Sequence, residues 1–230
     1  MRMRRKKNLT PRMASCETVW IKEPESHRGR WLEGHSQERV HLEIGCGKGK
    51  FTAETAATEP DILLVAIERV REAMVIAMER AVERGLDNIR FIDMDAERLT
   101  EVFAPGEVER IYLNFSDPWK SPRHAKRRLT SPGFLELYKQ ILAPGGEIHM
   151  KTDNLDLFKY SLTQFPACGY DLSQVTQDLH GQGIAGKMTD YEEKFYEAGT
   201  PICRCVARWS GAINGETDLM ECKRPAGLSE

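Results

Sequence analysis

The chain has 230 residues, of which 40% are hydrophobic and 30% are charged, and its formal net charge is −2. These values are typical of a soluble globular protein with one large domain or two small ones, and they argue against a surface that is basic throughout. No run approaches the roughly 18 apolar residues that a membrane-spanning helix needs, and the basic start of the chain has no apolar stretch behind it. We therefore expect no secretory signal, no membrane partner and a cytoplasmic location.

Apolar runs alternate with amphipathic stretches from residue 40 onward. Runs rich in branched side chains predict buried strands at residues 40–44, 62–68, 89–94, 110–115 and 147–152. The stretches between them predict helices at residues 50–58, 70–85 and 131–146, the last ending at Pro-Gly-Gly. A helix at 154–165 and strands near 170–179 and at 202–209 complete the pattern. This alternation predicts an α/β fold: a doubly wound, mostly parallel sheet with helices on both faces.

No internal repeat interrupts this pattern. We divide the chain into a basic N-terminal arm and lead-in (1–39), one main domain (40–210) and a polar C-terminal tail (211–230). Cations cluster at residues 2–12 and at residues 120–128. The first cluster fits a solvated, flexible tail as well as it fits a binding segment.

The six cysteines and six histidines show no spacing typical of a metal site. There is no CxxC pair, and Cys203 and Cys205 alternate in a predicted strand, where both face the same side. We therefore expect reduced, mostly structural cysteines and no metal. Nothing in the sequence indicates an obligatory protein partner.

Glycines and acids at the ends of predicted strands indicate a cofactor site. The first strand runs into LEIGCGKGK, which contains Gly45, Gly47 and Gly49, and the second strand ends in Glu68. In a doubly wound sheet these positions meet at the edge where nucleotide-like ligands bind, and an acid there can accept hydrogen bonds from both ribose hydroxyls. However, G-x-G-x-G is not the spacing of a pyrophosphate cradle, and Glu43 would repel a pyrophosphate. S-adenosylmethionine, which has a sulfonium and no phosphate, fits better than a dinucleotide.

The third strand adds a further acid to this edge. Asp95 is the first candidate to accept a hydrogen bond from the adenine amine, Asp93 is the competitor, and an aspartate after a strand is also a common helix cap. Acids and glycines at three successive strand ends together predict a methyltransferase site that binds S-adenosylmethionine.

The fourth strand leads into NFSDPWKSPRHAKRRL, residues 114–129. A carboxylate such as Asp117 can accept hydrogen bonds from the Watson–Crick edge of guanine, and cations can hold phosphates, so this segment predicts an RNA substrate. Trp119 either stacks on a base or packs as a half-buried residue, and Asp117 alternatively caps the turn before Pro118. The cations are Lys120, Arg123, Lys126, Arg127 and Arg128.

Four motifs make the sequence resemble the bacterial tRNA (guanine-N7)-methyltransferases. They are E-I-G-C-G-K-G in the glycine turn, D-P-W with R-H-x-K-R-R-L in residues 117–129, K-T-D-N at 151–154 and T-D-Y-E-E-K at 189–194. The resemblance extends from about residue 40 to residue 209. It implies a class I, Rossmann-like methyltransferase that acts on the variable-loop guanine of tRNA, position 46 in tRNA numbering, and produces N7-methylguanosine.

The resemblance also implies roles for single residues. Those implied to contact the cofactor are Glu43, Glu68, Asp95 and Asp117, and Asp117 is also implied to be catalytic. Those implied to form the substrate pocket are Asp153, Thr189, Tyr191 and Glu192. Without the resemblance, residues 189–194 predict only an exposed helix start, with Thr189 and Glu192 as a capping box.

The sequence departs from the family at one substrate position. The family usually reads D-P-W-P-K-K-R-H, whereas this chain has Lys120-Ser121-Pro122, so Ser121 occupies the slot of a substrate-binding lysine and Lys120 is the candidate to replace it. We assign Arg123 and His124 to the substrate as well, and Lys126, Arg127 and Arg128 to tRNA phosphates, with at least one of these three expected to pair with a helix acid instead. A methyltransferase with another acceptor, and a non-catalytic RNA-binding protein on the same fold, remain alternatives.

Overall fold

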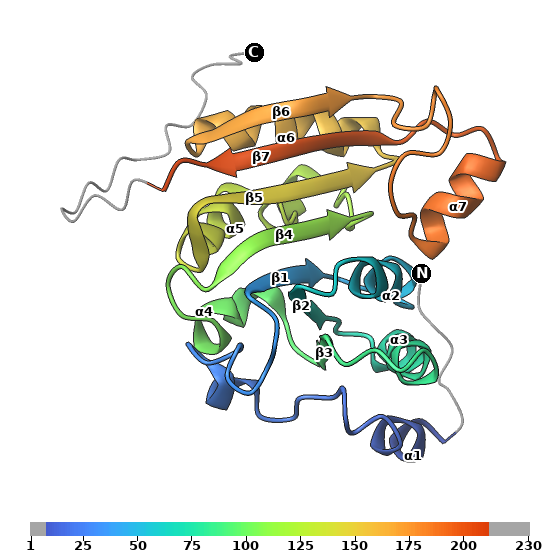
Figure 1. Ribbon diagram of the computed structural model, residues 1–230. Coiled ribbons are helices and arrows are strands. Elements are labelled where there is room, and N and C mark those ends of the chain that lie inside the picture. The colour runs from blue at the N-terminus through green and yellow to red at the C-terminus, as the bar shows by residue number, and fades with distance from the viewer. Residues whose placement is uncertain (1–7, 212–230) are drawn as a thin grey trace, which may run out of the picture.

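A seven-stranded sheet forms the centre of the structure, a computed structural model that describes residues 8–211 (Figure 1). The strand order is β3-β2-β1-β4-β5-β7-β6. The strands are β1 (Arg39–Ile44), β2 (Ile62–Ile67), β3 (Ile89–Ile92), β4 (Val108–Asn114), β5 (Leu142–Thr152), β6 (Tyr170–Thr176) and β7 (Cys203–Trp209). The strands β1 to β5 are parallel, and β7 runs antiparallel to both of its neighbours. The predicted mostly parallel sheet is confirmed, whereas the predictions for residues 1–7 and 212–230 lie outside the described residues.

Helices cover both faces of the sheet (Figure 1). They are α1 (Leu9–Ala14), α2 (Lys50–Thr58), α3 (Arg71–Glu83), α4 (Leu99–Val102), α5 (Pro132–Lys139), α6 (Leu155–Ala167) and α7 (Asp190–Glu197), with short 3-10 helices at Pro24–His27, Ala96–Arg98 and Pro122–Arg127. In β2, Leu63 and Val65 pack in the core beneath α4, α5 and α6, whereas Leu64 and Ala66 face α2 and α3. A strand buried on both faces reads as a continuous apolar run, which is why the sequence predicted it.

One predicted helix boundary is wrong. Residues 131–146 were expected to form one helix, but α5 ends at Lys139 and β5 already begins at Leu142. The Pro-Gly-Gly turn at 144–146 lies inside the strand, where the pairing between β4 and β5 shifts register between Val108 and Arg110. Gly145 takes φ 78°, so glycine makes this irregularity possible.

The lead-in packs against the main domain from residue 8 onward. Trp31 is 1% exposed and its indole N–H donates to the Val102 carbonyl (3.0 Å). Residues 19–21 exchange backbone hydrogen bonds with Phe91 of β3, so this segment covers the outer strand of the sheet. In α1, Arg12 forms two hydrogen bonds to Glu79 of α3 (2.6 and 2.5 Å). Within residues 8–211, no helix is long and apolar enough to span a membrane.

Candidate functional site

The carboxyl ends of the five parallel strands meet at one edge of the sheet, beside α2 and α7 (Figure 1). β1 and β4 are neighbours at the point where the strand order reverses. This is the position at which open α/β sheets form a ligand-binding crevice. The predicted site residues after β1, β2, β3, β4 and β5 are therefore brought to the same edge.

The three glycines after β1 have two different roles. Gly45 and Gly47 have φ 81° and 57°, and a Cβ atom built on either would meet nothing within 4 Å, so both border open space. A Cβ atom on Gly49 would lie 2.5 Å from the Cβ atom of Ala77 in α3. Gly45 and Gly47 thus leave room for a ligand to approach the backbone, whereas the lack of a side chain on Gly49 is needed for the close packing of α2 on α3.

Glu68 holds the glycine turn against the end of β2. One carboxylate oxygen accepts a hydrogen bond from the Gly47 N–H (3.0 Å) and the other from the Val70 N–H (2.8 Å). The side chain is half-buried, so the carboxylate borders the turn at the place where the sequence predicted an acid for the ribose.

Glu43 lies beneath the turn and is only 1% exposed. Its carboxylate accepts hydrogen bonds from Thr52 Oγ1 (2.6 Å) and from Asn114 Nδ2 (3.1 Å). Burial raises the pKa of Glu43 to about 7, the nearby Glu68 carboxylate adds to this, and the two hydrogen bonds oppose it. Sequence reasoning missed Thr52 and Asn114, although Asn114 is the polar last residue of an apolar strand.

Asp95, at the end of β3, forms the helix cap that the sequence offered as an alternative to an adenine contact. Its carboxylate caps the 3-10 helix Ala96–Arg98 by accepting from the Glu97 N–H (3.2 Å), and it also pairs with Arg69 (2.8 Å). The predicted cap is thus confirmed. The competitor Asp93 pairs with Arg71 and its side chain is 19% exposed, less than the 41% of Asp95. The more accessible carboxylate at this edge is therefore that of Asp95.

Asp117, after β4, is exposed and has no hydrogen bond or ion pair with any residue in the described range 8–211. Two residues close to it, Phe115 and Trp119, have φ of 54° and 41°, so this segment bends sharply in a conformation that is uncommon outside glycine. The bend presents Asp117 to solvent at the carboxyl edge of the sheet. Its carboxylate is free to accept hydrogen bonds from a ligand.

Arg128 stabilises this bend from within. Its guanidinium donates to the Pro118 carbonyl (3.0 Å) and the Trp119 carbonyl (3.1 Å), and it lies 4.3 Å from the ring centroid of Tyr160. The expectation that one of these three cations pairs with a helix acid is wrong for the described residues: Arg128 binds two backbone carbonyls and an aromatic ring instead.

The neighbouring cations are placed differently. Arg127 lies 4.7 Å from the ring centroid of Trp119, and the His124 ring meets the same indole edge-on at 5.7 Å. Trp119 is therefore a half-buried residue that packs between two side chains of the 3-10 helix Pro122–Arg127. The remaining side chains of the segment are exposed and form no ion pair within residues 8–211; they are Lys120, Ser121, Arg123 and Lys126.

The four expected substrate-pocket residues are not equally accessible. Asp153, after β5, is exposed without a side-chain partner among the described residues, and Tyr191 is 58% exposed. Thr189 and Glu192 form the predicted capping box of α7, with the Glu192 N–H donating to Thr189 Oγ1 (2.9 Å). Glu192, however, is fully buried and contacts Lys151, a residue that sequence reasoning missed. Burial lowers the pKa of Lys151, and the Glu192 carboxylate opposes this shift.

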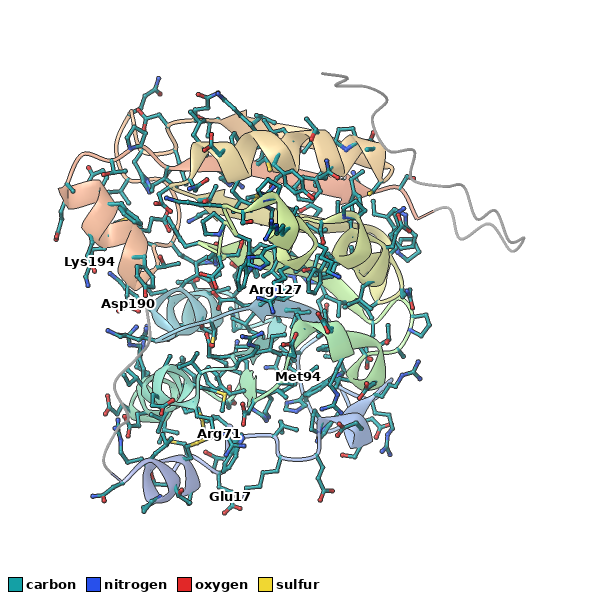
Figure 2. All side chains as sticks on the ribbon, turned by 180° about the vertical axis from the view of Figure 1, so that it is seen from behind. Glu17, Arg71, Met94, Arg127, Asp190 and Lys194 are labelled. Carbon is teal, nitrogen blue, oxygen red and sulfur yellow. The ribbon has the colours of Figure 1, made fainter. Side chains whose placement is uncertain are left out.

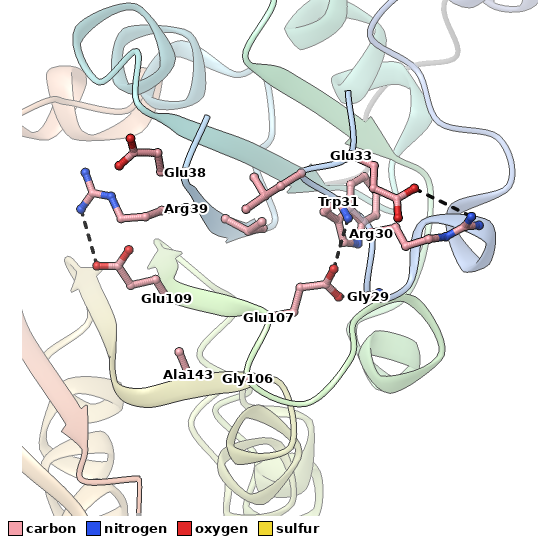
Figure 3. A pocket seen from close by; sticks show the side chains of 12 residues that line it. Gly29, Arg30, Trp31, Glu33, Glu38, Arg39, Gly106, Glu107, Glu109 and Ala143 are labelled. Atoms are coloured by element: carbon pink, nitrogen blue, oxygen red, sulfur yellow. Dashed lines mark hydrogen bonds and ion pairs between the residues drawn. The ribbon is translucent and has the colours of Figure 1, made fainter. Parts of the chain in front are cut away.

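The sheet borders two cavities in different places. One of about 280 Å³ adjoins the site and is lined by Asn114, Lys151 and the segment 185–187. Another of about 700 Å³ lies at the far edge of the sheet, where Glu107 accepts from the Trp31 N–H and Arg39 pairs with Glu109 (Figure 3). Because it borders the amino ends of β1 and β4, this larger cavity is remote from the predicted site residues. No cluster of three or more potential metal ligands occurs within residues 8–211.

The residues at the carboxyl edge fit a ligand with a nucleoside and a cationic centre. Glu43 lies in β1 beneath the turn, Glu68 binds the Gly47 N–H and Asp95 follows β3 at the same edge, which suits ribose hydroxyls, an amine and a positive charge. The ribose hydroxyls and amines of S-adenosylmethionine are donors that such carboxylates can accept.

Comparison with known proteins agrees with this arrangement. A family model described as "Putative methyltransferase" matches residues 37–205. The tRNA (guanine-N(7)-)-methyltransferase of Geobacillus kaustophilus (strain HTA426) is 47% identical over 210 residues, which cover 90% of this chain and 96% of that protein. The protein of the same name from Geobacillus sp. (strain WCH70) is 46% identical over 211 residues, covering 91% and 96%.

Among solved structures, the crystal structure of the 16S rRNA methyltransferase KamB superposes with a TM-score of 0.62 at 18% identity. The match covers 79% of this chain and 92% of that one. This likeness confirms the expected Rossmann-like class I methyltransferase fold.

Proposed function

The chain belongs to the family of tRNA (guanine-N7)-methyltransferases, and we propose that it transfers the methyl group of S-adenosylmethionine to N7 of a guanine in tRNA. We further propose that the target is the variable-loop guanine at position 46 of tRNA and that the product is N7-methylguanosine. The observation that carries the proposal is the unpartnered carboxylate of Asp117, which follows β4, the neighbour of β1 and its glycine turn, and precedes a basic 3-10 helix.

For the cofactor, the proposal assigns Glu68 to the ribose hydroxyls and Asp95 to the adenine amine. Glu43, beneath the glycine turn, supplies negative charge close to the cationic end of the ligand. S-adenosylmethionine, when bound, supplies an activated methyl group on a sulfonium. Gly45 and Gly47 leave the backbone open on the side from which such a ligand approaches.

For the acceptor, the protein need not remove a proton, because neutral guanine already has a lone pair at N7. Asp117 and Asp153 are the two exposed, unpartnered carboxylates at the ends of β4 and β5 in the described chain, and we assign them to the N1–H and N2–H donors of the base. Their charge also offsets the positive charge that develops on the methylated base. Of the two possible companions of Asp117, the burial of Glu192 favours Asp153.

For the rest of the tRNA, we assign the exposed cations of residues 120–127 to phosphates. Lys120 is accessible beside Ser121 and supports the idea that it replaces the family lysine. Arg128 is omitted from this set because it binds the Pro118 and Trp119 carbonyls. We also expect the base to leave its stack before N7 becomes reachable.

The experiment is an incubation of the purified protein with methyl-labelled S-adenosylmethionine and unmodified bulk tRNA, followed by nucleoside analysis. We expect 7-methylguanosine with the wild type and with Asp171→Asn, an exposed β6 control, and at least a hundredfold slower formation with Asp117→Ala. A tRNA transcript with adenine at position 46 should remain unlabelled. Cofactor binding without 7-methylguanosine would overturn the proposal in favour of another acceptor or of a non-catalytic RNA-binding protein.

A further inference from the structure

A buried ion pair joins β5 to α7 beside the site. Lys151 Nζ lies 2.9 and 3.1 Å from the two carboxylate oxygens of Glu192, and His180 Nε2 lies 3.0 Å from one of them. Lys151 also donates to the Lys187 carbonyl (2.7 Å). The Glu192 side chain is fully buried and that of Lys151 is 11% exposed. Removing one member of such a pair would leave the other charge buried without compensation, so this contact strongly favours one placement of α7.

Two further ion pairs at the start of this helix are weaker anchors. Asp190, at the start of α7, pairs with Arg80 of α3 (3.2 Å), and both side chains are 30% exposed (Figure 2). Lys187, just before α7, pairs with Glu59, the residue that follows α2, and these side chains are about a quarter exposed. Partly exposed pairs are screened by water and salt and stabilise little. The Lys151 contact is therefore the main electrostatic anchor of α7 in the described chain.

The helix in turn contacts both halves of the site. Phe195 of α7 stacks on Phe115, with ring centroids 5.8 Å apart, and Phe115 belongs to the bent segment that carries Asp117. Glu193 pairs with Lys50 (2.7 Å), the residue that follows the glycine turn and begins α2. A displacement of α7 would thus reach the acceptor side through a ring contact and the cofactor side through a partly exposed ion pair.

Resting on the proposed function, we infer that Lys151 is a positioning residue for methyl transfer: its buried contact with Glu192 fixes α7, and α7 holds the segment of Asp117 in its reactive place. On this inference Glu192 does not bind the guanine itself. It acts as the internal counter-charge through which Lys151 holds the helix. Thr189, which caps the same helix and binds Glu192, depends on the pair for its place.

The test compares Lys151→Met with Lys151→Arg and with the control Lys139→Met, which removes an i,i+3 ion pair on α5. Because tRNA affinity comes mainly from phosphate contacts, we expect Lys151→Met to lower kcat by roughly 30-fold while KM for tRNA and Kd for S-adenosylmethionine change less than about threefold. Lys151→Arg, which keeps a charge for Glu192, should recover most of kcat. Lys139→Met should match the wild type in all three constants.

Amide hydrogen exchange provides a second readout that does not require activity. Lys151→Met should speed exchange in residues 189–198, while peptides of β4 and β5 stay protected. The double variant Lys151→Met/Glu192→Gln removes both charges of the pair, so it should restore part of the protection in α7. Unchanged kcat or unchanged exchange in α7 would overturn the inference, as would a uniform rise in exchange across the sheet. If Lys151→Met does not fold, Glu192→Gln takes its place, with the same expected loss of protection in α7.

The two proposals fail in different ways. If wild-type protein binds S-adenosylmethionine but forms no 7-methylguanosine, the proposed function fails, whereas the exchange experiment still decides whether Lys151 anchors α7. If the wild type is active and Lys151→Met keeps full kcat, only the positioning role is wrong.

Discussion

Glu43→Gln should change how the stability of the protein depends on pH. The carboxyl group is 1% exposed and burial raises its pKa from 4.5 to about 7, so the folded protein binds this proton more tightly than the unfolded chain does. A raised pKa in the folded state contributes stability below the unfolded pKa and loses it as pH rises through the folded pKa. Between pH 4.5 and pH 7 the contribution therefore falls by on the order of 3 kcal/mol.

The magnitude depends on the environment of one carboxylate. The hydrogen bonds from Thr52 and Asn114 favour the charged form, but the buried position disfavours it more strongly. Glutamine has nearly the same shape and does not titrate, so the variant should lack this part of the pH dependence. It can still accept one of the two hydrogen bonds through its amide oxygen.

The assay is urea unfolding of wild type, Glu43→Gln and the exposed control Glu38→Gln at several pH values from 5 to 8. The difference in unfolding free energy between wild type and Glu43→Gln should shift in favour of the variant as pH rises, whereas Glu38→Gln should follow the wild type. S-adenosylmethionine, as a cation, should favour ionised Glu43 and so bind the wild type more tightly at pH 8 than at pH 6. Parallel curves for wild type and Glu43→Gln would refute the reasoning.

Three further predictions concern the turn and the basic segment. Gly49→Ala should lower the unfolding free energy by roughly 2 to 4 kcal/mol in urea titrations, because its Cβ atom would lie 2.5 Å from a side chain of α3. Gly45→Ala, which has open space around it, should lower the unfolding free energy less. Its main effect should be weaker cofactor binding, measured by titration. The double variant Lys126→Gln/Arg127→Gln should lower the slope of log Kd for tRNA against log salt concentration by about 1.5, measured by filter binding. Its affinity for the cofactor should not change. An unchanged slope would show that neither residue contacts a phosphate. Arg128→Gln should reduce kcat rather than the salt slope, because the guanidinium holds the bend before the 3-10 helix, and a lower slope with normal kcat would contradict this.

The sequence predicted the sheet better than it predicted the site. Parallel strands are buried on both faces, so their apolar runs are continuous and easy to recognise, and the edge at which their carboxyl ends meet follows from topology alone. The boundary between α5 and β5 was missed because Pro-Gly-Gly normally ends a helix and does not indicate a strand. Here the register shift beside β4 lets the strand start earlier and include the turn.

The chemistry of single side chains could not be read from residue type. Arg127 and Arg128 are equivalent in sequence, but only Arg128 binds the Pro118 and Trp119 carbonyls, a contact that depends on how the chain bends. Glu192 was expected in a substrate pocket, yet its environment is decided by Lys151, which comes from a distant strand. A capping motif predicts a helix start, but burial depends on tertiary contacts that no local pattern contains.

The lead-in segment also affects how readily the protein aggregates. An open sheet presents unpaired backbone groups at its outer strands, and such edges recruit strands from other molecules. Residues 19–21 occupy that position on β3, so the segment that follows the basic start of the chain also blocks self-association along this side. Truncation at residue 21 would therefore remove the N-terminal cations and open an aggregation-prone edge together. Charge-neutralising substitutions at residues 2–7 would remove these cations without removing residues 19–21, which cover β3.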